Sequence, residues 1–182
     1  TLCRIPRQSK QEHALRAHVC QWAVARGLTA TVDGVGNLIV AKPGSPGREH
    51  YPGVILQGHL DMVCQKNGAS THDFSRDPIQ PRLRDGWLEA PETTLGADNG
   101  IGVALALAVL ERDDLVHGPI EVLLTVDEEA GMGGAQGLEP GLLRGRLMLN
   151  LDTEEWGEFY LGCAGGLDVN VVRPGAATAP PV

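Results

Sequence analysis

The chain has 182 residues, and its formal charge at pH 7 is −8 because 23 acidic side chains outnumber 15 basic ones. An apolar fraction of 42% suits a soluble globular protein with a sizeable core, and no apolar run is long enough to span a bilayer. The sequence also has no stripe of lysine and arginine, so we expect neither a membrane nor a nucleic-acid partner.

The first predicted elements are a helix and a hairpin. Ser9 with Glu12 three residues later has the capping-box pattern, and apolar residues then follow helical spacing from 14 to 25, up to a stop at Gly27. Two predicted strands follow, over 28–32 and 37–41, and the turn 33–36 joins them as a hairpin. A loop rich in proline and glycine covers 42–52.

The next stretch, 54–63, reads VILQGHLDMV and begins as a continuous apolar run, which is typical of a strand buried on both faces. His59 and Asp61 lie where this run ends. Because residues two apart on a strand share a face, Asp61 can reach the His59 ring and fix its tautomer, as a metal-bound histidine requires. Taken alone, the pair is better interpreted as a structural hydrogen bond.

A polar stretch without regular period covers 64–85, and we assign His72 and Asp73 there to loop structure rather than chemistry. Residues 86–89 form a short strand or turn. A glycine-rich stretch, 93–102, then leads into a helix over 99–110 that is apolar all round and should therefore be packed within the fold. Asp98 precedes this helix and can be its N-cap, a metal ligand, or both.

Two further apolar runs resemble the first. Residues 120–126 predict a buried strand that runs into Asp127, Glu128 and Glu129, and 147–151 predict another that ends at Asp152. Adjacent carboxylates beside a core are costly unless a cation pairs with them, although a solvated acidic turn is the alternative. Strands are also predicted over 158–163 and 167–172, and a linker from Arg173 onward.

The three apolar runs predict an α/β fold, a three-layer α/β/α domain with a mostly parallel central sheet, in which the strands of Ile55, Leu123 and Leu149 lie near the middle. Open α/β sheets place their sites beyond the carboxyl ends of their strands. One imidazole with several carboxylates suits zinc, manganese or cobalt. The sequence therefore predicts a metal site built from the strand ends.

Five motifs in order, GHLDMV, TTLGADNGIG, LLTVDEEAGM, NLDTEE and GCAGG, resemble the amino-terminal half of the aminoacyl-histidine dipeptidases. These belong to a di-zinc metallopeptidase family that also includes carnosinases and aminoacylases. The resemblance implies hydrolysis of Xaa-His and other small dipeptides by a water activated between two zinc ions. It also implies a cytoplasmic homodimer in the full-length form, in agreement with four scattered cysteines and no apparent signal peptide.

The resemblance implies a role for each site residue. His59 and Asp152 would bind one zinc, Glu129 the other, and Asp98 both, with a cis peptide bond between Asp98 and Asn99. Asp61 would orient the His59 ring, and Glu128 would be the general base.

The family's second zinc also takes a histidine from the carboxyl-terminal half, and no histidine here follows His117. We therefore expect a fragment in which 1–167 is the amino-terminal part of the catalytic domain and 168–182 begins a lid and dimerisation insertion. The alternatives are a deacylase or carboxypeptidase of the same superfamily, or a metal-binding fragment without catalytic activity.

Overall fold

In the computed structural model, five strands of the described residues form the central sheet, in the spatial order β1-β2-β6-β3-β7. Their bounds are Thr29–Val32 for β1, Leu38–Lys42 for β2, Val54–His59 for β3, Ile120–Thr125 for β6 and Leu147–Asn150 for β7. β3 is parallel to β6 on one side and to β7 on the other, whereas β2 is antiparallel to both β1 and β6. Only β2 therefore runs against the other four strands, which confirms the predicted fold class and the predicted hairpin.

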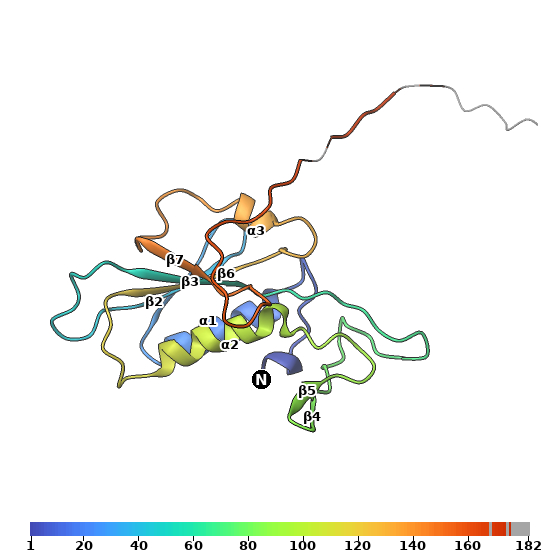
Figure 1. Ribbon diagram of the computed structural model, residues 1–182, viewed down its shortest axis with the longest axis horizontal. Coiled ribbons are helices and arrows are strands. Elements are labelled where there is room, and N and C mark those ends of the chain that lie inside the picture. The colour runs from blue at the N-terminus through green and yellow to red at the C-terminus, as the bar shows by residue number, and fades with distance from the viewer. Residues whose placement is uncertain (168, 174, 176–182) are drawn as a thin grey trace, which may run out of the picture. The chain divides into compact units, whose positions relative to one another are not determined.

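Helices α1 (His13–Val24) and α2 (Ala97–Glu111) both cover the same face of this sheet, as Figure 1 shows. The larger core lies under them, where Leu15, Val103 and Val122 are among the buried side chains. The opposite face carries the short helix α3 (Gly133–Gln136) and the segment that follows it, whose leucines 138, 142 and 143 pack on Ile39, Ile55 and Leu123. The domain therefore has three layers, with most of its helical residues on one side.

The predicted place of the third apolar strand is wrong, because β7 forms an edge of the sheet rather than its middle. Its side chains are exposed: Leu147 by 55%, Met148 by 46% and Leu149 by 42%. An apolar run predicts a strand that can be buried on both faces. It does not predict whether another strand pairs with each of its two edges, because that depends on the rest of the fold. β3 and β6 do lie centrally, as predicted.

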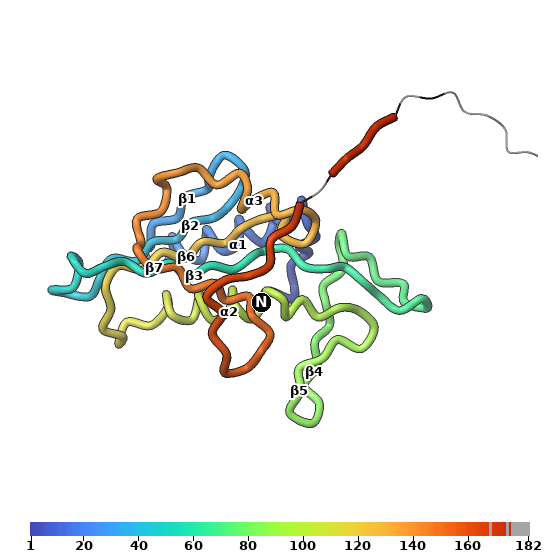
Figure 2. The backbone as a smooth tube through the Cα atoms, turned by 45° about the horizontal axis from the view of Figure 1, so that its top comes forward, coloured from blue at the N-terminus to red at the C-terminus, as the bar shows by residue number. Residues whose placement is uncertain are grey.

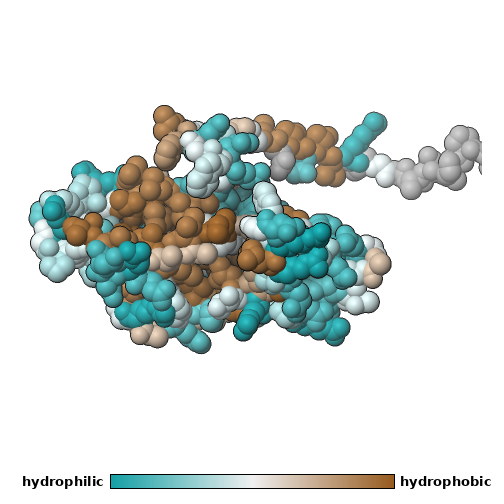
Figure 3. All heavy atoms as spheres, turned by 60° about the horizontal axis from the view of Figure 1, so that its bottom comes forward, coloured by the Kyte–Doolittle hydropathy of each residue, from teal (hydrophilic) through white to brown (hydrophobic). Residues whose placement is uncertain are grey.

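Helix α2 is also less buried than its composition suggests. Gly102, Val103, Ala106 and Leu110 face the sheet, whereas Ile101 and Leu105 are more than half exposed. Figure 3 shows apolar residues gathered on the side of the molecule where α2 lies. Among the described residues, α2 is the longest helix, and neither it nor any other helix is long and apolar enough to cross a membrane.

A small hairpin lies apart from the main sheet. Strands β4 (Arg82–Arg84) and β5 (Trp87–Glu89) pair with each other alone, and Figure 2 shows them on a loop that projects from the end of the domain. The loop predicted for 64–85 therefore contains a short strand, β4, near its end. Asp85 and Gly86, both with positive φ, make the turn that joins β4 to β5. The chain also begins with a short 3-10 helix, Leu2–Arg4.

The structure describes residues 1–167, 169–173 and 175. The chain divides into two units, Thr1–Asp152 and Thr153–Val182, and all helices and strands of the described residues lie in the first. The strand predicted over 158–163 is wrong, and the described residues of 167–172 form no strand either. A pattern of apolar residues is not enough to make a strand without a neighbour to pair with. Most of the predicted linker after Arg173 lies outside the described residues, and the domain boundary at 167 stays a prediction.

Candidate metal centre

The site begins with His59, the last residue of β3, whose side chain is buried. The parallel register aligns His59 with Thr125 of β6, so the acidic residues 127–129 leave the sheet at the same edge. β7 is parallel to β3 as well and leads to Asp152 at that edge. The carboxyl ends of the parallel strands therefore bring the predicted residues together, as expected for an α/β sheet.

Asp61 lies behind the His59 ring, with its Oδ1 3.3 Å from Nδ1 of the imidazole. Its carboxylate also accepts hydrogen bonds from the Ser9 hydroxyl at 2.7 Å and from the amides of Glu128 and Glu129 at 3.1 Å each. Burial favours the neutral carboxyl, but the contact with His59 and the hydrogen bonds from Ser9 and the two amides outweigh it and keep the pKa of Asp61 well below its usual range. Asp61 therefore stays charged beside the ring, at the position from which it was predicted to orient His59, and that orienting role stays a prediction.

The other ring nitrogen, Nε2, faces three carboxylates from three different segments. Asp98 Oδ1 lies 2.9 Å away, Asp152 Oδ1 3.7 Å and Glu128 Oε2 3.9 Å. Two groups have ligand atoms all within 4.8 Å of one another: His59 with Asp98 and Asp152, and His59 with Glu128 and Glu129. All six residues singled out in the sequence therefore meet in one cluster, although their roles stay predictions.

Asp98 is placed by a kink at the start of α2. Asp98 and Asn99 have non-helical backbone angles, and the peptide bond between them is cis, as predicted. Asp98 is not the N-cap, because Gly96 occupies that position. Its carboxylate turns instead toward His59, so of the two roles considered for Asp98 the position favours that of ligand.

Asn99 is a member of the site that the sequence did not reveal. Its buried amide donates to the Leu151 carbonyl and to Asp152 Oδ1, both at 2.7 Å. Gly58 and Gly102 make room for it, since a Cβ atom on either would lie within 2.5 Å of the Asn99 side chain. The one signal in the sequence for this role of Asn99 is that its amide side chain directly follows the candidate ligand Asp98.

The cluster holds an excess of negative charge. Oε1 of Glu129 is buried and has no hydrogen-bond partner among the described residues. Burial and the charge of Asp98 raise the pKa of Glu129, and burial together with Asp98 also raises the pKa of Asp152. Such a set of oxygen and nitrogen donors could hold a metal ion, and its composition fits zinc, manganese or cobalt.

The same carboxylates act on the histidine. Burial disfavours the charged imidazolium, but the contact with Asp61, the charge of Asp152 and the bond with Asp98 outweigh it and raise the pKa of His59 to about 9. Without a metal, the ring therefore carries a proton at neutral pH and serves as the cation of the cluster.

The N-terminal segment supplies two more residues that the sequence did not reveal. The predicted Ser9 cap is wrong, because α1 begins at His13 with Glu12 as its N-cap, and the Ser9 hydroxyl binds Asp61 instead. Arg7, which had no signal in the sequence, donates to the carbonyls of Leu60 and Asp61. Ser9 and Glu12, the two residues of the capping-box pattern, therefore make tertiary contacts to the site, with Asp61 and with the amide of Asp127.

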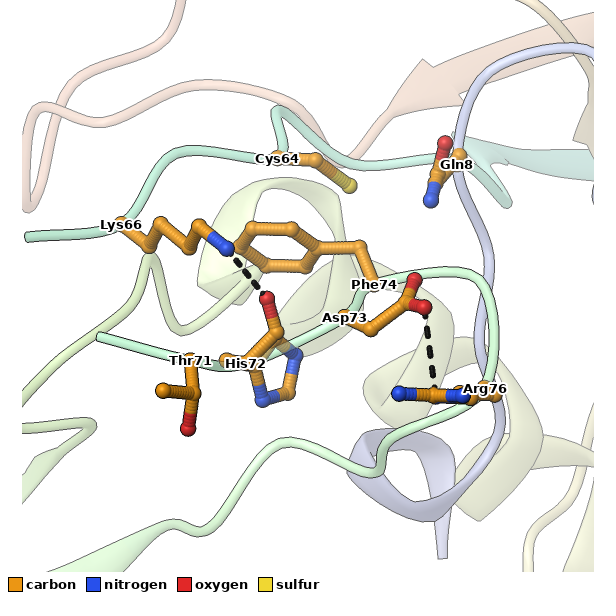
Figure 4. A pocket seen from close by; sticks show the side chains of 8 residues that line it. All are labelled: Gln8, Cys64, Lys66, Thr71, His72, Asp73, Phe74 and Arg76. Atoms are coloured by element: carbon orange, nitrogen blue, oxygen red, sulfur yellow. Dashed lines mark hydrogen bonds and ion pairs between the residues drawn. The ribbon is translucent and has the colours of Figure 1, made fainter. Parts of the chain in front are cut away.

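A hollow of about 490 Å³ lies on the surface around His72 and Asp73 and contains none of the six site residues. Figure 4 shows that its polar groups bind one another: Lys66 Nζ donates to the His72 carbonyl at 2.6 Å, and Arg76 Nε lies 3.2 Å from Asp73 Oδ2. These contacts agree with the assignment of His72 and Asp73 to loop structure.

Comparison with known proteins gives consistent matches. Residues 55–172 match peptidase family M20/M25/M40. The cytosol non-specific dipeptidase of Escherichia coli K12 is 52% identical over 167 residues, which are 92% of this chain and 34% of that protein. The chain therefore spans about a third of the length of this relative.

Solved structures agree. The aminoacylhistidine dipeptidase of Vibrio alginolyticus superposes with a TM-score of 0.83 at 53% identity, over 86% of this chain and 32% of that one. The aminopeptidase PepT of Bacillus cereus gives a TM-score of 0.70 over 85% of this chain and 41% of that one. At 24% identity, this second likeness shows the fold alone.

Proposed function

The chain belongs to peptidase family M20/M25/M40, and from this premise we propose that it carries the metal-binding part of a zinc-dependent dipeptidase. The substrates would be Xaa-His and other small dipeptides. The observation that carries the proposal is the meeting of Asp98, Glu128 and Asp152 around Nε2 of the buried His59. The names of the Escherichia coli and Vibrio relatives, both dipeptidases, support the choice of substrate class.

The described residues would hold the metals unequally. His59, Asp98 and Asp152 are three protein ligands for one zinc, which leaves an open position, as catalytic zinc sites have. Glu129 would bind the second ion and share Asp98 with the first. No histidine follows His117 to complete that second set. We therefore expect about one firmly held zinc per chain and a second one held weakly, with manganese or cobalt able to substitute.

The chemistry follows from the carboxylates that remain. When bound, a pair of zinc ions lowers the pKa of water and polarises the scissile carbonyl. Glu128 would take the proton from the attacking water and pass it to the leaving amine, because its partly exposed carboxylate can move protons to and from a substrate. Asp61 would keep the His59 ring in the orientation that metal binding requires.

The whole protein, of which this chain corresponds to about a third of the relatives' length, would act in the cytoplasm as a homodimer. The cytosolic relative supports the compartment, and the dimer rests on the family resemblance alone.

A chimera tests the proposal. The segment of the Escherichia coli dipeptidase that matches this chain would be replaced by the chain's own residues, and hydrolysis of β-alanyl-histidine would be measured with added zinc. We expect dipeptide hydrolysis, and a loss of about 10²-fold or more in kcat for Glu128→Gln. Glu111→Gln is the matched control, since Glu111 pairs with Arg26 on the surface.

A substrate panel separates the alternatives. Faster hydrolysis of acyl-amino acids than of dipeptides would indicate a deacylase or carboxypeptidase. A folded, zinc-loaded chimera with no hydrolysis of either class would show that this chain binds metal without supporting catalysis. Equal rates for the native and Glu128→Gln chimeras would refute the proposed base.

A further inference from the structure

The segment Arg7–Glu12 touches three loops: the loop after β3, the loop before α2 and the loop after β6. The candidate metal ligands lie in or beside these loops, except for Asp152, which follows β7. It passes beside the end of β3, where Gln8 and Met62 form an isolated parallel bridge. Three of its side chains, those of Arg7, Ser9 and Glu12, then bind main-chain or side-chain atoms of these loops. This segment lies far from the loops in sequence, so its contacts can set their relative positions.

Arg7 connects two of the loops directly. Its side chain is buried, with 3% exposed, and Nη1 donates to the carbonyls of Leu60 at 2.9 Å and Asp61 at 2.8 Å. Nη2 donates to the carbonyl of Gly96, two residues before Asp98. One guanidinium thus joins the backbone beside His59 to the backbone beside Asp98.

The loop before α2 is shaped to admit this guanidinium. A Cβ atom on Gly96 would lie 2.4 Å from Arg7 Nη2, and one on Gly100 would lie 2.9 Å from the same atom. Gly96 also has a φ of +70°, a conformation that glycine adopts without strain. Two glycines of this loop therefore leave the space that Arg7 fills.

Ser9 and Glu12 hold the remaining loop. The Ser9 hydroxyl donates to Asp61 Oδ2, and Asp61 in turn accepts the amides of Glu128 and Glu129. The buried Glu12 accepts the amide of Asp127 through Oε1 at 2.8 Å. The loop after β6 is thus bound both through Asp61 and directly.

We propose that Arg7 is a positioning residue of the metal centre, which sets the distance between His59 and Asp98, and that Ser9 supports it through Asp61. This inference rests on the proposed function. A planar guanidinium with several donors in fixed directions can bind three carbonyls of two loops at once, whereas an ammonium is a single point of attachment. Residues that orient metal ligands commonly change metal affinity by 10- to 100-fold when they are mutated.

Metal binding to the 182-residue chain tests the proposal. Zinc affinity would be measured by competition with a chromophoric chelator, and cobalt(II) would report ligand geometry through its visible absorption bands. For Arg7→Met and Arg7→Lys we expect zinc affinity to fall by about 10- to 100-fold, with altered cobalt bands at saturation. Ser9→Ala should weaken zinc binding by a smaller factor.

Arg16→Lys is the matched control, because Arg16 also donates to a main-chain carbonyl, that of Gly36, away from the cluster. Circular dichroism and melting would identify variants that are folded at the assay temperature. A merely structural Arg7 would lower melting temperature without changing the cobalt bands of the saturated protein.

Each outcome decides the proposal. The proposal is overturned if folded Arg7→Lys and Arg7→Met both keep the native zinc affinity and the native cobalt bands. If Arg7→Met does not fold, unchanged zinc binding in both Arg7→Lys and Ser9→Ala overturns it. Loss of affinity in Arg7→Met but not in Arg7→Lys would show that charge alone matters and would also overturn it. A native chain that binds no zinc would refute the proposed metal centre itself, which is a different result from native binding that the variants leave unchanged.

Discussion

Zinc binding by this chain should release a proton from His59. The pKa of His59 is raised to about 9 in the metal-free protein, so at pH 7 about one ring in 100 is neutral and ready to bind. Zinc bound by His59 would displace the proton of Nε2, and the Nδ1 proton would remain on the side of Asp61. Apparent zinc affinity should therefore rise about tenfold per pH unit between about pH 6.5 and 8.5.

The sign of the accompanying change in stability follows from the same pKa. Because the folded value lies above the ordinary value of 6.5, His59 stabilises the metal-free protein fully below about pH 6.5, and this contribution is lost as pH rises through about 9. Alkaline pH should thus destabilise the metal-free protein while it strengthens zinc binding.

Calorimetry in two buffers of different ionisation enthalpy measures the proton release. The native chain should release about one proton per zinc at pH 7 from this group. Asp61→Asn removes the main contact that raises the pKa of His59, so its proton release at about pH 7.5 should be smaller. Asp33→Asn is the matched control, since Asp33 also accepts several main-chain amides but lies in the turn before β2. Zinc binding without proton release by the native chain would refute the reasoning.

Three further predictions concern stability. Zinc at 100 times its Kd should raise the free energy of unfolding by about 2.7 kcal/mol, and a melting shift that persists in His59→Ala would contradict the proposed ligand. Gly58→Ala would place a Cβ 2.3 Å from Asn99 Oδ1 and should cost about 1–3 kcal/mol in urea unfolding; an unchanged midpoint would show that Asn99 can move freely. Leu124→Ala, at a fully buried position near the end of β6, should cost about 2–5 kcal/mol, whereas Leu149→Ala on exposed β7 should cost less than about 1 kcal/mol; equal costs would contradict the edge position of β7.

The local pattern of the chain was sufficient for most of the elements and for the six candidate site residues, but not for Asn99, Ser9 and Arg7. Continuous apolar runs identified β3 and β6, and the turn 33–36 identified the β1–β2 hairpin. Since each of the parallel strands continues into acidic residues, their meeting at one edge followed from the geometry of α/β sheets. The individual ligand roles and the cis bond after Asp98 came from the family resemblance, not from any pattern.

Tertiary structure decided what local patterns do not encode. An apolar run states that a strand can be buried, but the partners available decide whether it is, and β7 and one side of α2 remain exposed. A serine three residues before a glutamate can cap a helix or bind a distant carboxylate, and Ser9 binds Asp61, 52 residues away. Arg7 shows the same limit, because its three carbonyl partners lie more than 50 residues along the chain and become neighbours only when the sheet and α2 have packed. The sequence by itself thus determined which side chains could bind a metal, and the fold decided which other side chains hold them in place.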